Sequence, residues 1–232
     1  MHVRLRQAAW SGLEPDTLLP TMRNRHHLGH PNAPGADLVM SAHRTELFSD
    51  AVLAIALTLL VLDLSIRTFQ ASQLQGTLLH MWPTYVAFIA AFFYVSVMWI
   101  NHHFAFARLN SVDKPVMWAN IAILCGAVVL PFPTSLVALA FEQGTQTDQR
   151  VAVVLYALLA ALMTLSWAIF FVVVSHRPHL WKHEDSVHVW THEIRRSTAG
   201  AVGYALTAII GFFVPEVGLA LFLFFPIYYA FA

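Results

Sequence analysis

Residues 44–66 read RTELFSDAVLAIALTLLVLDLSI, a polar opening followed by an almost uninterrupted apolar run. A helix needs about 20 predominantly apolar residues to cross the ~30 Å hydrocarbon core of a bilayer. The run from Phe48 to Ile66 meets that requirement. We therefore predict that it forms a membrane-spanning helix, which the chain enters through Arg44 and Phe48-Ser49-Asp50.

The composition of the whole chain also indicates a membrane protein. Apolar residues make up 58% of the 232 residues and charged residues only 11%, whereas a typical soluble domain has about 25% charged residues. One soluble core could not bury so much apolar surface, so lipid must solvate part of it. The formal net charge is zero with neutral histidines, which gives no basic signal for nucleic acid.

Five further apolar segments follow along the chain, and each is a candidate spanning helix. They are Leu78–Phe106, Pro115–Phe141, Val151–Ser175, Ala199–Val214 and Val217–Ala232. With the first run they predict an all-α membrane domain of six spanning helices over residues 41–232, since backbone groups in lipid must satisfy one another. Only Pro215-Glu216 separates the last two segments, which form either a tight hairpin or one broken unit.

Residues 1–40 have a different composition from this domain. They are polar and are interrupted by several prolines. Arg4 and Arg6 are not followed by the apolar stretch that a secretory signal peptide requires. We therefore predict a mobile tail rather than a signal peptide.

The positions of the Lys and Arg residues predict the orientation in the membrane. With six crossings, the N-terminal tail lies on the same side as the second and fourth loops. Every Lys and Arg except Arg67 and Arg150 falls on that side. Because cytoplasmic segments carry the excess of basic residues, we expect both termini to be cytoplasmic.

Several specific positions carry a resemblance to a known family. Arg44 and Phe48-Ser49-Asp50 form an R-x-x-x-F-S-D motif, and further matches follow downstream at Trp99, His102, His103, Asp113, Trp118, Asn120 and Pro131-Phe132-Pro133-Thr134. Together they resemble the transmembrane protein 175 family, the lysosomal potassium channels and their bacterial relatives. The resemblance covers about Ala42 to Leu139, and the rest of the chain matches only in helix count.

The resemblance implies a bacterial potassium channel in the plasma membrane. In that family the bacterial subunit has six helices, and four subunits assemble around a central pore lined by the first helix. The resemblance places Ile55, Leu59 and Leu62 at an apolar constriction and Thr58 in a polar layer one turn from Ile55. The expected partners are further copies of the chain, lipid and permeant potassium ions, and no cofactor is expected.

The residues themselves support only part of this assignment. Ile55, Leu59 and Leu62 are spaced by four and then three, so they share one helical stripe. Rings of such side chains can gate a pore by dewetting. The helix is apolar on all sides, however, so its periodicity leaves open whether this stripe lines a pore or packs against a neighbour.

Polar residues near the predicted cytoplasmic face form a second candidate site. Asp50 lies just inside the first helix, where an unpaired charge is costly and indicates a function by default. We predict a polar network that joins Arg44, Ser49 and Asp50 to His102, His103 and Asn120. Simple capping of the helix end is the alternative.

Asp63 lies near the predicted extracellular end of the first helix. It could pair with Arg67 four residues later, which is worth only ~0.2–0.5 kcal/mol. Four copies around a symmetry axis would instead concentrate cations at the mouth of a pore. The sequence leaves both interpretations open.

The remaining titratable residues predict neither a metal site nor an enzyme. His179 with His183, and His188 with His192, have a spacing that can hold a metal on a helix, but they lie in a polar loop, so we predict solvated histidines. Carboxylates and histidines inside the spans lie at different depths without a recognised catalytic spacing. Cys125 is the only cysteine, and its apolar neighbours predict a small core residue.

Two other functions remain open alongside a potassium channel. A proton-conducting pathway is possible because titratable residues are available within the spans. A non-conducting membrane scaffold is also possible, because a tightly closed apolar stripe looks the same in sequence. Near the end of the chain, Ala199, Gly203, Thr207 and Gly211 are spaced by four, which predicts a small-residue ridge for close helix packing.

Overall fold

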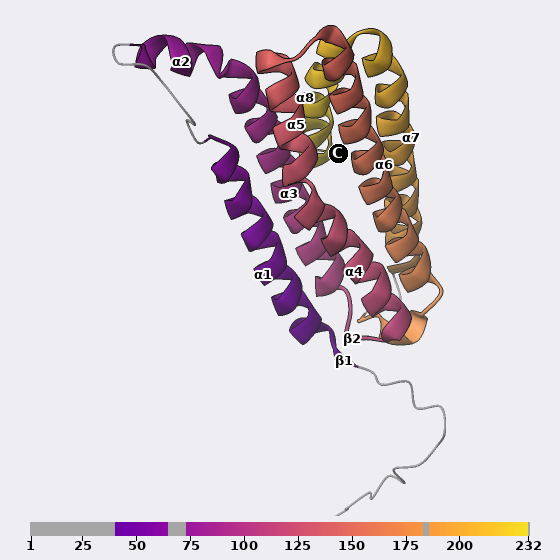
Figure 1. Cartoon of the computed structure of the whole chain (residues 1–232). Coiled ribbons are helices and arrows are strands. Elements are labelled where there is room, and N and C mark those ends of the chain that lie inside the picture. Colours follow the sequence, from indigo (N-terminus) through magenta and orange to yellow (C-terminus); the bar gives the residue numbers. More distant parts are fainter. Residues whose placement is uncertain (1–39, 65–72, 183–185, 232) are drawn as a thin grey trace, which may run out of the picture. The chain divides into compact units, whose positions relative to one another are not determined.

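The computed structural model describes residues 40–64, 73–182 and 186–231, and nearly all of them are helical (Figure 1). The helices are α1 (Ala42–Leu60), α2 (Leu74–His80), α3 (Trp82–Ala107), α4 (Lys114–Val129), α5 (Pro131–Gln143), α6 (Gln146–Ser175), α7 (Ser186–Phe213) and α8 (Pro215–Phe231). Two short strands, β1 (Met40–Ser41) and β2 (Ser111–Val112), pair in antiparallel register. The predicted N-terminal tail, apart from its last residue, lies outside the described residues.

Among the described residues, three helical stretches are long and apolar enough to cross a membrane. They are α3, the combined stretch Lys114–Gln143 that contains α4 and α5, and α6. Helix α8 is apolar but shorter. A helical membrane protein is therefore confirmed, whereas the number of six crossings stays a prediction.

The predicted helix Pro115–Phe141 is divided at Leu130 into α4 and α5. Pro131 and Pro133 have no N–H group to donate to the preceding turn, so the regular backbone ladder is interrupted there. The carbonyl oxygen of Leu130 accepts from both the backbone N–H of Thr134 at 3.3 Å and its hydroxyl at 2.8 Å, where α5 begins. Hydropathy reports an apolar run but does not report this break.

Helix α7 begins at Ser186, well before the predicted start at Ala199. Its first turns are polar, so the hydropathy of the sequence reported only the apolar part of a longer helix. Only Val214 separates α7 from α8, and Gly211 and Gly218 approach each other closely across the turn. The last two segments therefore form a tight hairpin rather than one broken unit.

Small residues of α7 allow this close packing, but the first member of the ridge is not the predicted one. Ala199 is exposed, and it is Gly200 that lies against Tyr229 of α8. Gly203 lies against Phe225, and Gly211 lies against Val153 of α6. A side chain at these glycines would occupy the space of its neighbours.

At one end of the helices, β1 pairs with β2, which belongs to the loop 108–113, and that loop contacts the loop 177–182 (Figure 1). We call this set of contacts the loop collar. Leu109 forms a β-bridge with Trp181. Asp113 caps α4 by accepting a hydrogen bond from the backbone N–H of Val116, and its second carboxylate oxygen lies 2.6 Å from Nε of Arg177. The collar thus fixes the start of α1 relative to α4 and α6.

We predict that Gly211→Ala lowers the thermal unfolding temperature of the purified protein in detergent. The added Cβ would collide with Val153, which lies in a close-packed interior. Gly76→Ala in α2 is the matched control, because nothing lies within 4 Å of the position of its new Cβ. An unfolding temperature that is equal in the two variants would contradict this packing of α6, α7 and α8.

Candidate pore helix and its polar anchor

The two faces of α1 have different surroundings. Leu53, Ala56 and Leu60 are fully buried against the rest of the subunit. Ile55 and Leu62 lie on the opposite side and are 58% and 63% exposed. The subunit therefore leaves one apolar face of α1 without cover from its own described residues.

All the residues predicted for the pore constriction and its polar layer lie on this exposed face. Leu59 is 40% exposed, and Thr58 is exposed with its hydroxyl donating to the carbonyl oxygen of Ile55 at 2.8 Å. That backbone bond holds the Thr58 hydroxyl close to the helix surface. These side chains do not pack in the core of their own subunit, so they face lipid, a pore or another chain.

A chain of buried hydrogen bonds, which we call the polar anchor, joins α1 to α4 and α3. The Ser49 hydroxyl donates to the carbonyl oxygen of Thr45 at 2.9 Å. Asn120 donates from Nδ2 to Ser49 Oγ at 2.9 Å, and its Oδ1 lies 2.9 Å from Nε2 of His102. Ser49, Asn120 and His102 are at most 1% exposed.

The direction of these bonds fixes the protonation of the histidine ring. Because Oδ1 of Asn120 can only accept, Nε2 of His102 carries the proton. Nδ1 of His102 has no hydrogen-bond partner among the described residues. The ring stacks on Phe106 at 4.3 Å and lies T-shaped to the ring of Trp167 at 6.1 Å, so aromatic side chains enclose it.

The other predicted members of the network lie in more exposed positions around this anchor. Asp50 accepts a hydrogen bond from Nε1 of Trp99 at 3.0 Å, and Nδ1 of His103 lies 2.9 Å from Glu46 Oε1. Arg44 and Phe48 are exposed. The structure therefore brings Ser49, Asn120 and His102 together and gives Asp50 and His103 separate partners.

Sequence reasoning missed two of these partners. Glu46 precedes Asp50 by one helical turn, so both carboxylates lie on one face of α1. Trp99 precedes His103 by the same spacing on α3, and the two rings stack at 6.4 Å. If the two pairs had been interpreted as stripes on facing sides of α1 and α3, the contacts Trp99–Asp50 and His103–Glu46 would have been predicted.

Three other predicted positions have different outcomes. The backbone of Asp63 belongs to a 3-10 turn over Val61–Leu64, whereas its side chain and Arg67 lie outside the described residues. Cys125 is exposed on α4, so its prediction as a core residue was wrong: in lipid an apolar residue need not be buried. Among the described residues, no group of three or more His, Cys, Asp or Glu side chains could hold a metal ion.

We predict that Asn120→Leu lowers the thermal unfolding temperature markedly. Leucine cannot pair with the Ser49 hydroxyl or with Nε2 of His102, and each buried unpaired group costs about 1–3 kcal/mol. His103→Gln on α3 is the control, because the side chain of His103 is 55% exposed and an exposed change is usually worth within about 0.5 kcal/mol. Equal unfolding temperatures in the two variants would rule out a stabilising role for the polar anchor.

Comparison with known proteins places this arrangement in a family. The family described as "Endosomal/lysosomal potassium channel TMEM175" matches residues 44–131, which contain the whole polar anchor and all of α1 except its first two residues. A potassium channel of Streptomyces collinus is 30% identical over 192 residues, covering 81% of this chain and 91% of that protein. A potassium channel of Chamaesiphon minutus is 36% identical over 143 residues, covering 60% of this chain and 64% of that protein.

Solved structures agree with this assignment. The crystal structure of a lysosomal potassium-selective channel TMEM175 homolog from Chamaesiphon minutus has a TM-score of 0.70 at 27% identity, covering 82% of this chain and 96% of that chain. A variant of the potassium channel MtTMEM175, bound to a nanobody–MBP fusion protein, has a TM-score of 0.56. At 18% identity that likeness bears on the fold alone. From its near full-length relative and the family match over residues 44–131, the chain belongs to the TMEM175 family.

Proposed function

We propose that this chain is the subunit of a potassium channel whose pore is lined by the exposed face of α1. The observation that carries the proposal is that Ile55, Leu59 and Leu62 lie together on the side of α1 that its own subunit leaves uncovered. The similar proteins from Streptomyces collinus and Chamaesiphon minutus are both named as potassium channels. Potassium is therefore the permeant ion that we assign.

Each subunit crosses the membrane six times in this proposal. The crossings are α1, α3, α4 with α5, α6, α7 and α8. Four subunits surround the pore, so that the exposed face of each α1 turns toward a common axis. An apolar face of this kind requires either lipid or other chains to cover it, and tetramer formation would cover it along the axis.

The chemistry of the α1 face suits a pore that excludes water when it is narrow. Rings of Ile55, Leu59 and Leu62 would present only apolar surface to the axis, and such constrictions gate by dewetting. Thr58 would add a ring of hydroxyl groups beside the Ile55 ring, since its side chain lies on the same face. Ions would meet polar oxygen atoms only at that level of the constriction.

The channel lies in a bacterial plasma membrane with both termini in the cytoplasm. The loop collar contributes several basic residues at one end of the helices, among them Arg108, Arg177 and Lys182. Basic residues favour the cytoplasmic side. The polar anchor lies toward the same end, so the ion would enter the constriction past Asp50 and Glu46 when it comes from the cytoplasm.

We predict that Ile55→Asn increases potassium flux through the purified protein in liposomes under a potassium gradient. A ring of amides in place of Ile55 would hold water in the constriction and lower the barrier to a hydrated ion. Ile169→Asn is the matched control, because Ile169 is exposed to a similar extent on α6, a helix outside the proposed pore. Its flux should equal that of the wild type.

Three outcomes of this experiment would contradict the proposal. Absence of potassium flux from the wild-type protein and from Ile55→Asn alike would indicate a non-conducting scaffold. A reversal potential that follows the pH gradient and ignores the potassium gradient would indicate a proton pathway. An equal increase of potassium flux in Ile169→Asn would show that the effect of Ile55→Asn does not depend on α1 lining the pore.

We also predict that Asp63→Asn lowers potassium conductance at low ionic strength and has little effect at high ionic strength. A ring of carboxylates at the outer mouth would raise the local cation concentration, and salt screens this attraction beyond about 10 Å at 0.1 M. Single-channel conductance measured in low and high potassium chloride provides the test. A conductance ratio that does not change with salt would favour the simple pair with Arg67.

A further inference from the structure

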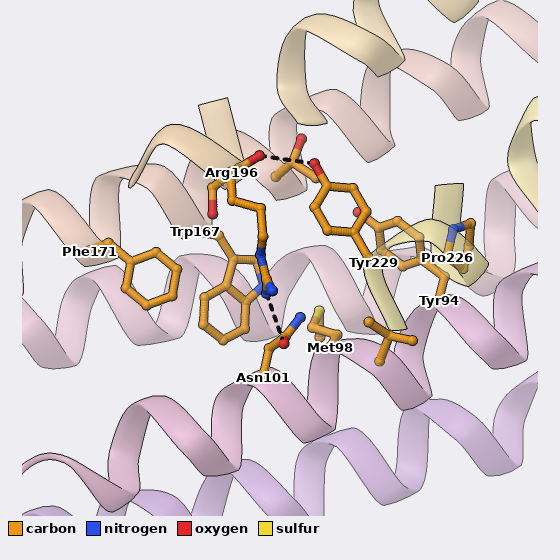
Figure 2. A pocket seen from close by; sticks show the side chains of 11 residues that line it. Tyr94, Met98, Asn101, Trp167, Phe171, Arg196, Pro226 and Tyr229 are labelled. Carbon is orange, nitrogen blue, oxygen red and sulfur yellow. Dashed lines mark hydrogen bonds between the residues drawn. The ribbon is translucent and has the colours of Figure 1, made fainter. Parts of the chain in front are cut away.

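A groove between α3, α6, α7 and α8 lies outside the proposed pore, and we call it the Arg196 groove. Its outer part has a volume of about 270 Å³ and is lined by Ile100, Asn101, Phe104, Ala105, Arg108, Phe171, Trp190, Glu193, Arg196, Tyr229 and Ala230. It shares Asn101, Phe171, Arg196 and Tyr229 with a smaller inner cavity that continues toward Trp167 (Figure 2). The two cavities therefore lie on either side of these four side chains.

The length of α8 explains why the groove exists. Its 17 residues extend about 26 Å at ~1.5 Å per residue, whereas the 28 residues of α7 extend about 42 Å. Because the two helices meet at Val214, the described part of α8 stops well short of the start of α7. Tyr229 and Ala230, in the last described turn, form one wall of the groove.

This geometry places the groove at the boundary between hydrocarbon and headgroups. A helix of about 26 Å falls a few Å short of a ~30 Å hydrocarbon core. The groove that begins at its end therefore lies where the phosphates and glycerol groups of one leaflet begin. Ile100 and Phe104, which line the outer part, are 43% and 57% exposed, and they offer an apolar surface to an acyl chain.

The polar groups of the groove carry an excess of one positive charge. Nη2 of Arg196 donates to Oδ1 of Asn101 at 2.9 Å, and its guanidinium carbon lies 5.6 Å from the centre of the Tyr229 ring (Figure 2). Glu193 lies 3.3 Å from Nε of Arg196. Arg108 adds a second guanidinium group, so two cations face a single carboxylate.

We propose that the Arg196 groove binds the phosphodiester headgroup of an anionic phospholipid from the surrounding membrane. Guanidinium groups bind phosphate oxygens through N–H donors. Nη2 and Nε of Arg196 already face Asn101 and Glu193, and Nη1 of Arg108 donates to the carbonyl oxygen of Phe104, so the phosphate would be bound by the remaining N–H groups of the two arginines. A lipid with one net negative charge neutralises the groove, whereas a zwitterionic lipid adds a further cation beside the two arginines. The proposal concerns lipid binding and does not rest on ion conduction.

Thermal unfolding of the full-length protein in detergent, titrated with dioleoyl phosphatidylglycerol or dioleoyl phosphatidylcholine, tests the proposal. We expect phosphatidylglycerol to raise the unfolding temperature at about tenfold lower concentration than phosphatidylcholine. Arg108→Gln and Arg196→Gln should each raise the required concentration of phosphatidylglycerol about tenfold, the equivalent of one lost charged hydrogen bond. Inorganic phosphate at the same concentrations should have no effect.

Two further variants separate this site from general surface charge. Arg195→Gln removes the same charge from an exposed neighbour on α7 that does not line the groove, and it should leave the titration unchanged. Ala230→Trp fills the groove without changing any charge and should weaken binding of phosphatidylglycerol. If Arg196→Gln fails to fold, Arg108→Gln and Ala230→Trp decide the question.

The same titrations define the results that would overturn the proposal. Equal effects of the two lipids would show that the groove does not recognise an anionic headgroup. An equal loss in Arg195→Gln and Arg108→Gln would assign binding to surface charge. A shift with inorganic phosphate as large as that with phosphatidylglycerol would make the groove a site for a free anion.

Discussion

The buried hydrogen bonds from His102 through Asn120 to Ser49 determine how α1 sits on α3 and α4. Apolar contacts such as those of Leu53 permit several rotations of a helix that is apolar on all sides. A polar group left unpaired in an apolar environment costs several kcal/mol, so the rotation of α1 that presents Ser49 Oγ to Nδ2 of Asn120 is favoured. That rotation also decides which apolar side chains of α1 remain outside, and Ile55 is among them.

Much of this arrangement could be predicted from the sequence, because hydropathy and spacing report on lipid and on helix faces. The membrane location, the helical class and the family follow from such signals. Hydropathy reports neither the division at Leu130, which Pro131 and Pro133 mark in the sequence, nor the early start of α7, which lies outside the apolar run. The pairing of Glu46 with His103 was within reach of the sequence, because each residue lies one turn from its neighbour in a stripe on α1 or α3.

The polar anchor and the Arg196 groove share one side chain. Trp167 lines the inner cavity of the groove, and the edge of its ring meets His102. A molecule that displaces Trp167 therefore alters the surface against which His102 packs. The two regions use neighbouring residues of α3, Asn101 and His102, and the Trp167 indole of α6 contacts both.

The interhelical hydrogen bonds described for α1 all lie near its start, at Glu46, Ser49 and Asp50. Interhelical hydrogen bonds therefore hold α1 near its start, and apolar contacts, which have no preferred direction, hold the rest of it. The helix can be treated as a rod that is fixed at one end. Leu62 lies thirteen residues beyond Ser49, or about 20 Å along the axis. A tilt of about ten degrees at the held end would carry Leu62 sideways by about 3 Å. A movement too small to break any hydrogen bond at the base is thus magnified at the far end of the rod.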